Sequence, residues 1–212
     1  MGREFIDLFD EWSKDYDLTV AGQDEQYREV FAGYDGILEA VASRSAGTVV
    51  EFGVGTGNLT ERLLARGRQV YGIEPSPGMR RQIGKRALPF TLLDGDFLQF
   101  PPLPAKVDTI VSTYAFHHLT DGEKDAAIEL YGRLLGPGGK IVFADTAYRD
   151  DEERKAIQDS AREAGYDQLL NDLLTEYYTT LDVLEKAFTR YGFSVDFSRL
   201  NRYVWLMDAT KN

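Results

Sequence analysis

The stretch "VVEFGVGTGNLTERLL", Val49 to Leu64, limits the possible folds of this 212-residue chain more than any other feature. Apolar and β-branched residues lead into three glycines, Gly53, Gly55 and Gly57, and then into a pattern typical of an amphipathic helix. A glycine turn at such a junction lets a ligand approach the backbone, because a Cβ there would clash or would forbid a positive φ. The stretch therefore predicts a buried strand, a ligand-binding loop and a helix in succession.

Short apolar runs repeat this alternation along the chain. Five are expected to form buried strands: "TVVEFG" (48–53), "QVYGIE" (69–74), "FTLLDGD" (90–96), "VDTIVSTY" (107–114) and "KIVFAD" (140–145). Helical or turn-like segments separate them, and this βαβ alternation builds a parallel sheet with helices on both faces.

Helix boundaries are predicted from capping residues. Ser76 is expected to cap a helix whose first residue is Pro77, and Asp121 to cap a helix over residues 122–135. The apolar spacing also predicts two N-terminal helices, over residues 4–14 and 25–42.

The end of the chain predicts how the sheet closes. A helix over residues 181–191 is ended by Gly192, and the runs "FSVDFSRL" and "YVWLMDATK" follow, separated only by Asn201 and Arg202. So short a gap indicates an antiparallel hairpin. We expect one α/β domain with a seven-stranded, mostly parallel sheet, an antiparallel last strand and N-terminal helices.

Composition excludes several classes of protein. The net charge of -11 repels the phosphates of nucleic acids and anionic membranes, and no window approaches the length of a membrane span. The chain has no cysteine, so disulfides, thiolate nucleophiles and zinc–cysteine sites are excluded. We expect a cytoplasmic protein, a monomer or a homodimer, that binds neither nucleic acid nor membrane.

The spacing of the glycines distinguishes between nucleotide ligands. A dinucleotide fingerprint is G-x-G-x-x-G, whereas the third glycine here comes one residue early and Asn58 occupies the expected position. Glu51, two residues before the first glycine, would repel a pyrophosphate but would attract an ammonium group. These features favour a ligand that carries positive charge.

Four motifs together make the chain resemble the class I methyltransferases that use S-adenosylmethionine. They are "VVEFGVGTG", the acid in "VYGIEPSPGM", the acid in "LLDGDFLQF", and "LLGPGGKIVFAD". Within that class the opening "MGREFIDLFDEWSKDYD" is similar to the bacterial YrrT family. The resemblance implies a Rossmann-like three-layer sandwich and the cofactor S-adenosyl-L-methionine.

The resemblance also implies cofactor contacts for Gly53, Glu74 and Asp96. Glu74 ends the second strand, where its two oxygens can accept both ribose hydroxyls. Asp96 can accept from the adenine amino group, and Phe97 offers an apolar face to the ring. Asp94 competes with Asp96 for the adenine role, and the resemblance favours Asp96. The other candidates for cofactor contacts are Glu51, Gly55 and Gly57 of the glycine loop. Tyr16 is a further candidate, because its ring could make a cation–π contact with the sulfonium.

Methyl transfer from a sulfonium depends mainly on alignment, so a catalytic base is optional. His117 and His118, the two histidines of the chain, follow the fourth strand, where ligands of open α/β sheets bind. Neighbouring side chains diverge, so one of the pair is expected to face the cleft, and His117 is the candidate base. No nearby spacing of His, Asp and Glu completes a metal site, so no metal is expected.

The function predicted from the sequence is in-line methyl transfer to a small-molecule acceptor. Residues 1–45 are expected to form a helical cap, 46–146 the cofactor-binding core, 147–178 a substrate lid, and 179–212 the last helix and the hairpin. The segment between the fifth strand and the last helix carries Tyr148, Tyr177 and Tyr178, which suit either a lid or a hydrophobic seam. Two alternatives stay open: an NAD-dependent oxidoreductase and a non-catalytic S-adenosylmethionine-binding protein.

Overall fold

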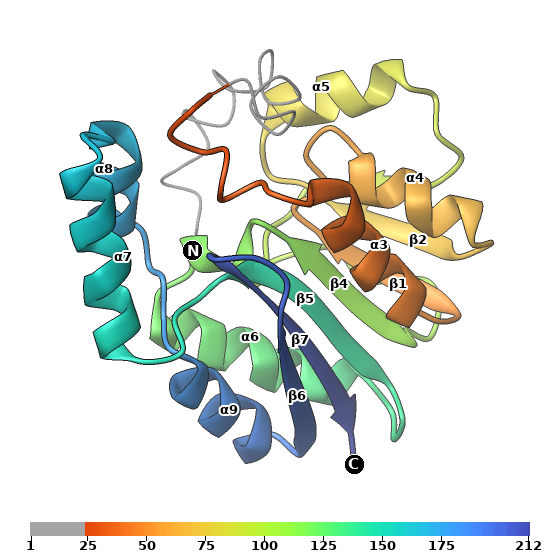
Figure 1. Cartoon of the computed structure of the whole chain (residues 1–212). Coiled ribbons are helices and arrows are strands. Elements are labelled where there is room, and N and C mark those ends of the chain that lie inside the picture. Colours follow the sequence, from red (N-terminus) through yellow and green to blue (C-terminus); the bar gives the residue numbers. More distant parts are fainter. Residues whose placement is uncertain (1–23) are drawn as a thin grey trace.

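The computed structural model describes residues 24–212, and within them seven strands form one sheet in the order β3-β2-β1-β4-β5-β7-β6 (Figure 1). The strands are β1 (Thr48–Phe52), β2 (Gln69–Ile73), β3 (Thr91–Leu93), β4 (Thr109–Thr113), β5 (Lys140–Thr146), β6 (Phe193–Arg199) and β7 (Val204–Lys211). Neighbours run parallel from β3 to β5, and β7 is antiparallel to both β5 and β6. The predicted fold class is therefore confirmed. The predicted helix over residues 4–14, and Tyr16, lie outside the described residues.

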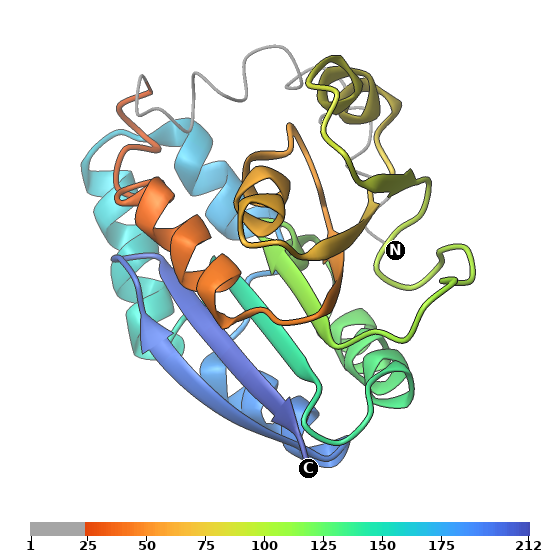
Figure 2. The same ribbon diagram turned by 90° about the vertical axis from the view of Figure 1, so that its right-hand side faces the viewer.

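Helices cover both faces of the sheet (Figures 1 and 2). One face packs against α6 (Asp121–Leu134) and α9 (Leu181–Arg190), and the other against α3 (Tyr34–Arg44), α4 (Asn58–Ala65), α7 (Asp151–Glu163) and α8 (Asp167–Thr175). Adjacent residues of β1 show the division, because Val49 belongs to the second core and Val50 to the first. None of the helices in residues 24–212 has the length and apolar character needed to cross a membrane.

The chain order creates a reversal point between β1 and β4. The chain proceeds outward from β1 through β2 to β3, and then returns to place β4 on the other side of β1. Ligands of open α/β sheets bind at the carboxyl ends of the strands beside such a point. The fold thus brings together the segments that follow β1, β2, β3 and β4.

Two predicted helix boundaries are wrong. The predicted helix over residues 25–42 is interrupted, because residues 25–33 form turns and α3 begins only at Tyr34, after Gly33 with φ 74°. Thr120, and not Asp121, caps α6: its hydroxyl accepts from the Glu123 N–H and the Glu123 side chain accepts from the Thr120 N–H. Ser76, with Pro77 as the first helical residue, caps α5 (Pro77–Lys85) as predicted.

Candidate functional site

A cleft with about 680 Å³ of empty space, part of it open to solvent, lies at the carboxyl ends of the strands. It is lined by Phe52, Gly53, Gly55, Ile73, Glu74, Pro75, Met79, Asp96, Phe97, Thr113, Tyr114, Ala115 and His118. These residues come from the loops after β1, β2, β3 and β4, which the chain reversal brings together.

The glycine loop forms the floor of the cleft. Gly53 has φ 69°, and a Cβ there would lie 2.7 Å from the Cβ of Ala115, so a side chain is excluded by both backbone and space. Gly55 has φ 56°, and its N–H donates to Glu74 Oε2 at 2.9 Å. The loop after β1 is thereby fastened to the end of β2.

Two carboxylates reach the cleft from neighbouring strand ends. Glu74 is buried, and its other oxygen, Oε1, accepts from the Ser76 N–H at 2.9 Å. Asp96 is also buried, and its Oδ1 accepts from the N–H groups of Leu98 and Gln99 at 2.9 and 2.8 Å. Backbone donors therefore hold both carboxylates in fixed orientations.

Asp94 and Asp96, the two acids between which the sequence left a choice, lie in different environments. The Asp94 side chain is 62% exposed and pairs with Arg80 at 3.0 Å, whereas Asp96 lines the cleft. Beside Asp96 the ring of Phe97 stacks on Phe52 with centroids 5.1 Å apart. The cleft thus combines an apolar wall with a buried acceptor at its edge.

Glu51 lies under the loop rather than in the cleft wall. It is 1% exposed, its Oε2 accepts from the Thr60 hydroxyl at 2.6 Å, and it is not among the described residues that line the cleft. Its other oxygen, Oε1, is buried without a hydrogen-bond partner in the described part of the chain. The pKa of Glu51 is raised to about 8. Burial is the main cause, the hydrogen bond from Thr60 opposes it, and the negative charge of Glu74 adds to it.

Substitution of Glu51 by glutamine is expected to change how stability depends on pH. The folded-state pKa of about 8 lies above the ordinary value of 4.5, so the folded chain holds this proton more tightly than the unfolded chain. The stability that the protonated group contributes is complete below about pH 4.5 and is lost as the pH rises through about 8. At about 1.4 kcal/mol per pKa unit, the loss is on the order of 5 kcal/mol.

Urea unfolding of the wild type and Glu51→Gln at about pH 5 and pH 8 tests this expectation. The free energy of unfolding of the wild type should fall relative to that of the variant as the pH rises, because the glutamine cannot ionise. An equal pH dependence in the two proteins would show that Glu51 ionises normally.

The chain turns sharply after β4 and so places the histidine pair. Tyr114 has φ 53°, an unusual left-handed conformation for a bulky residue, and the short helix η2 (Phe116–His118) follows. His118 lines the cleft, whereas His117 is not among the described residues that line it. The 3₁₀ turn therefore places His118, and not the predicted base His117, in the cleft wall, and the assignment of the base to His117 stays a prediction.

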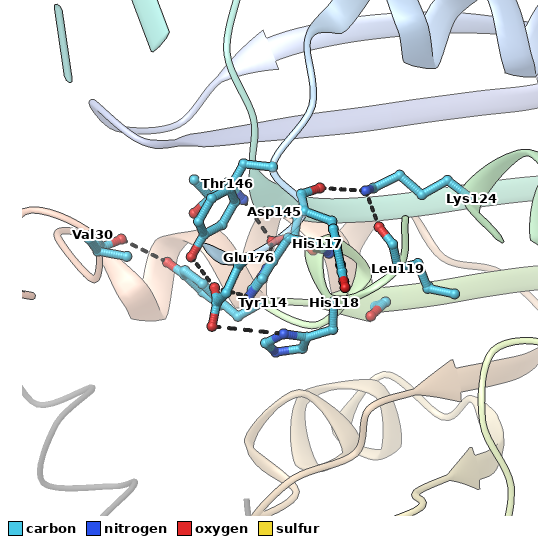
Figure 3. Close-up of polar contacts among 12 residues, drawn as sticks. Val30, Tyr114, His117, His118, Leu119, Lys124, Asp145, Thr146 and Glu176 are labelled. Atoms are coloured by element: carbon cyan, nitrogen blue, oxygen red, sulfur yellow. Dashed lines mark hydrogen bonds and ion pairs between the residues drawn. The ribbon is translucent and has the colours of Figure 1, made fainter. Parts of the chain in front are cut away.

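His117 lies between two carboxylates (Figure 3). Its Nδ1 is 2.5 Å from Asp145 Oδ1, at the end of β5, and its Nε2 is 3.3 Å from Glu176 Oε2, at the end of α8. His118 Nδ1 is 3.9 Å from the other Glu176 oxygen, Oε1. The side chains of these four residues are 2% to 10% exposed, so they form one buried polar cluster.

Backbone contacts fix Glu176 in this cluster. The Tyr177 N–H donates to the His117 carbonyl at 3.2 Å, and the buried Lys124 ammonium donates to the Tyr177 carbonyl at 2.5 Å. The Tyr178 hydroxyl donates to Glu176 Oε2. Tyr148 and Tyr178 pack edge to face in the core, so these two tyrosines form a hydrophobic seam, whereas Tyr177 is 37% exposed.

The two imidazoles have opposite pKa shifts. Burial lowers the pKa of His117, but Asp145 and Glu176 together raise it above its ordinary value. Burial lowers the pKa of His118 well below its ordinary value, and the neighbouring His117 and Lys124 lower it further. The histidine in the cleft wall is therefore the neutral one.

Known proteins match this chain over its whole length. The family described as a methyltransferase domain matches residues 49–139. An uncharacterized methyltransferase of Geobacillus kaustophilus is 58% identical over 100% of this chain and 99% of its own length, and one of Bacillus cytotoxicus is 57% identical over 100% of both. The chain belongs to the S-adenosylmethionine-dependent methyltransferases.

Solved structures of methyltransferases share the fold of this chain at low sequence identity. Magnesium protoporphyrin IX methyltransferase from Synechocystis, crystallised with S-adenosylhomocysteine, has a TM-score of 0.75 and 17% identity over 100% of both chains. The DhpI complex with S-adenosylhomocysteine has a TM-score of 0.70 and 16% identity over 100% of this chain and 97% of the other. The sequence left an NAD-dependent oxidoreductase open as an alternative, and the family assignment decides against it.

Three features of the histidine cluster were not predicted from the sequence: Asp145, Glu176, and the position of His118 in the cleft wall. Asp145 ends a predicted strand, as Glu74 ends another, and that position was the signal that could have found it. Glu176 follows α8 far along the chain from the histidines, and no local pattern connects them. For this reason the sequence did not indicate that the candidate ligand atoms of His117, His118 and Glu176 lie within 4.8 Å of one another, and the expectation that no metal binds stays a prediction.

Proposed function

We propose that S-adenosylmethionine binds in the cleft and that its methyl group is transferred in line to a small-molecule acceptor. The observation that carries the proposal is the pair of buried carboxylates, Glu74 and Asp96, each held by backbone N–H groups at the edge of a cleft whose floor is the glycine loop. They lie at the reversal point of the sheet, where nucleotide-like ligands of this architecture bind.

The residues in the cleft fit the parts of the cofactor. In the proposed complex Glu74 accepts from the ribose hydroxyls, Asp96 accepts from the adenine amino group, and Phe97 and Met79 contact the ring. Gly53 and Gly55 let the amino-acid portion approach the backbone.

The chemistry requires little besides alignment. The bond between sulfur and the methyl carbon breaks as the bond between that carbon and the acceptor forms. Sulfur keeps the electron pair and becomes neutral, and the acceptor proton leaves to a base or to water. Holding the reactants in line contributes about 7 to 11 kcal/mol to such a reaction. Tyr114, Ala115 and His118 line the part of the cleft nearest the end of β4, which is where we place the acceptor.

A small acceptor is favoured by the amount of chain around this end of the cleft. Residues 147–178, which include α7 and α8, form the insertion between β5 and α9 that we propose as the lid. Two of the fold neighbours are a magnesium protoporphyrin IX methyltransferase and a glycopeptide N-methyltransferase. An acceptor of limited size is consistent with both.

Binding of isotope-labelled S-adenosylmethionine to the purified chain, measured by equilibrium dialysis with NADH as a competitor, tests the proposal. One mole of S-adenosylmethionine should bind per chain and NADH should not displace it. Absence of binding at millimolar cofactor would overturn the proposal. Release of S-adenosylhomocysteine with small thiols, amines or hydroxyl compounds separates an enzyme from a protein that binds the cofactor without turnover.

A further inference from the structure

We propose that His117, His118 and Glu176 form a binding site for one divalent metal ion of the zinc type, beside the acceptor end of the cleft. Their candidate ligand atoms, two imidazole nitrogens and one carboxylate oxygen, lie within 4.8 Å of one another (Figure 3). The three side chains come from η2 and from the end of α8, and each is at most 10% exposed. The fold therefore gathers three good metal ligands at one buried point.

The contacts of His117 require a cation between His117 and Glu176. At 2.5 Å from Asp145 Oδ1, Nδ1 donates its hydrogen to that carboxylate. In the neutral imidazole the other nitrogen, Nε2, then carries a lone pair, and this lone pair is 3.3 Å from the acceptor oxygen of Glu176. Two acceptors in contact repel each other, so either a proton or a metal ion must lie between them.

The distance from His118 to Glu176 is one that a shared metal ion can bridge and a shared proton cannot. His118 Nδ1 is 3.9 Å from Glu176 Oε1, which is too long for a hydrogen bond. Two ligand atoms that are each about 2.1 Å from a tetrahedral ion lie about 3.4 Å apart. The separations of 3.3 Å from His117 Nε2 to Glu176 Oε2 and 3.9 Å from His118 Nδ1 to Glu176 Oε1 involve both oxygens of the carboxylate. With one ligand atom from each residue, the three atoms lie within 4.8 Å of one another, so the side chains would have to draw together by about 1 Å around one ion.

The second layer of contacts is of the kind that supports a metal site. Asp145 orients His117 through Nδ1, as carboxylates commonly orient metal-binding histidines, and Tyr178 donates to Glu176 Oε2. Asp145 and Glu176 bring two negative charges, whereas Lys124 brings one positive charge and directs its ammonium to the carbonyls of Leu119 and Tyr177. Metal binding requires both imidazoles to be neutral, and in that state the cluster carries a net negative charge that a divalent cation offsets.

Two histidines and one carboxylate are a ligand set of zinc enzymes that keep a further coordination position for water or substrate. Because His118 also lines the cleft, an ion on its Nδ1 would lie just behind the wall where we place the acceptor. There it would polarise an acceptor oxygen or sulfur and favour loss of its proton. This role rests on the proposed function, whereas the binding of the ion does not.

Metal titration of the full-length, chelator-treated protein tests the site. Zn²⁺ is the first probe, with the metal content of the dialysed protein measured by elemental analysis, and Co²⁺ is the second, because its absorption spectrum reports coordination geometry. One equivalent of Zn²⁺ should be retained per chain, and Co²⁺ should give the spectrum of a four- or five-coordinate ion. Glu176→Gln and His118→Gln should each weaken Zn²⁺ binding at least tenfold.

Asp172→Asn is the matched control, because Asp172 is an acid on the same helix whose carboxylate accepts from Tyr27 and is not one of the ligands. It should retain Zn²⁺ like the wild type. Failure of the folded wild type to retain either ion, or equal retention by Glu176→Gln and Asp172→Asn, would overturn the proposal. In the first case an imidazolium signal from His117 in the NMR spectrum would identify the cation as a proton.

Failure of the metal site and failure of the proposed function give different results. Glu74→Ala should lose affinity for S-adenosylmethionine and keep Zn²⁺, since Glu74 does not belong to the cluster. Intact cofactor binding without Zn²⁺ binding overturns the metal site alone, and the reverse result overturns the cofactor site alone.

Discussion

Glu74→Ala and Asp96→Ala are each expected to weaken binding of S-adenosylmethionine at least tenfold, which corresponds to about 1.4 kcal/mol. Each substitution removes acceptor oxygens that we assign to the nucleoside. Each also leaves buried backbone N–H groups without their acceptor: those of Gly55 and Ser76 at Glu74, and those of Leu98 and Gln99 at Asp96. Isothermal titration with the cofactor measures both effects.

Asp94→Ala is the matched control for this prediction. Asp94 lies two residues before Asp96, but its side chain is 62% exposed and pairs with Arg80 outside the cleft wall. Its removal should change the affinity less than twofold. Unchanged affinity in both Glu74→Ala and Asp96→Ala would place the cofactor elsewhere, and circular dichroism of each variant separates a lost contact from a lost fold.

The sheet was predictable because its strands are buried on both faces. Such strands are short continuous apolar runs, as "KIVFAD" is, and their order along the chain gives parallel pairing through the chirality of βαβ connections. Helix ends were less predictable, since they depend on single residues. Gly33 in a left-handed conformation ends a periodicity that otherwise continues, and Thr120 forms a capping box that the neighbouring Asp121 obscured.

The two halves of the site differed in predictability for a related reason. Gly53 and Glu74 directly follow β1 and β2, and Asp96 lies in the loop just after β3, so the sheet alone brings them to one edge. The histidine cluster depends on tertiary packing instead. The direction of His117 is set by the φ of Tyr114 and by the 3₁₀ turn, and Glu176 arrives through the docking of α8. No local pattern in the sequence encodes those contacts.

Gly57→Val is expected to have the largest effect on stability among substitutions in the glycine loop. Gly57 has φ 88° and is the N-cap residue of α4, and a Cβ there would lie 1.7 Å from Cδ1 of Ile83, a residue of α5 that is 1% exposed. Strain at a left-handed non-glycine residue costs about 1 to 3 kcal/mol. Overpacking of a filled core costs about 1 to 3 kcal/mol more. The free energy of unfolding should therefore fall by roughly 2 to 6 kcal/mol in urea titrations.

Alanine substitutions separate the two contributions. Gly55 has φ 56° and nothing within 4 Å of the position of its Cβ, so Gly55→Ala carries the backbone strain without the clash and should be the milder change. Gly57→Ala carries both, and Ile83→Val removes the Cδ1 atom that the new Cβ would meet. The double variant Gly57→Ala/Ile83→Val should be more stable than the sum of the two single changes predicts, by about 0.5 to 3 kcal/mol. If the two changes are strictly additive, Ile83 does not clash with the new Cβ. The whole effect then comes from the backbone strain at Gly57, because that strain does not depend on the side chain at position 83.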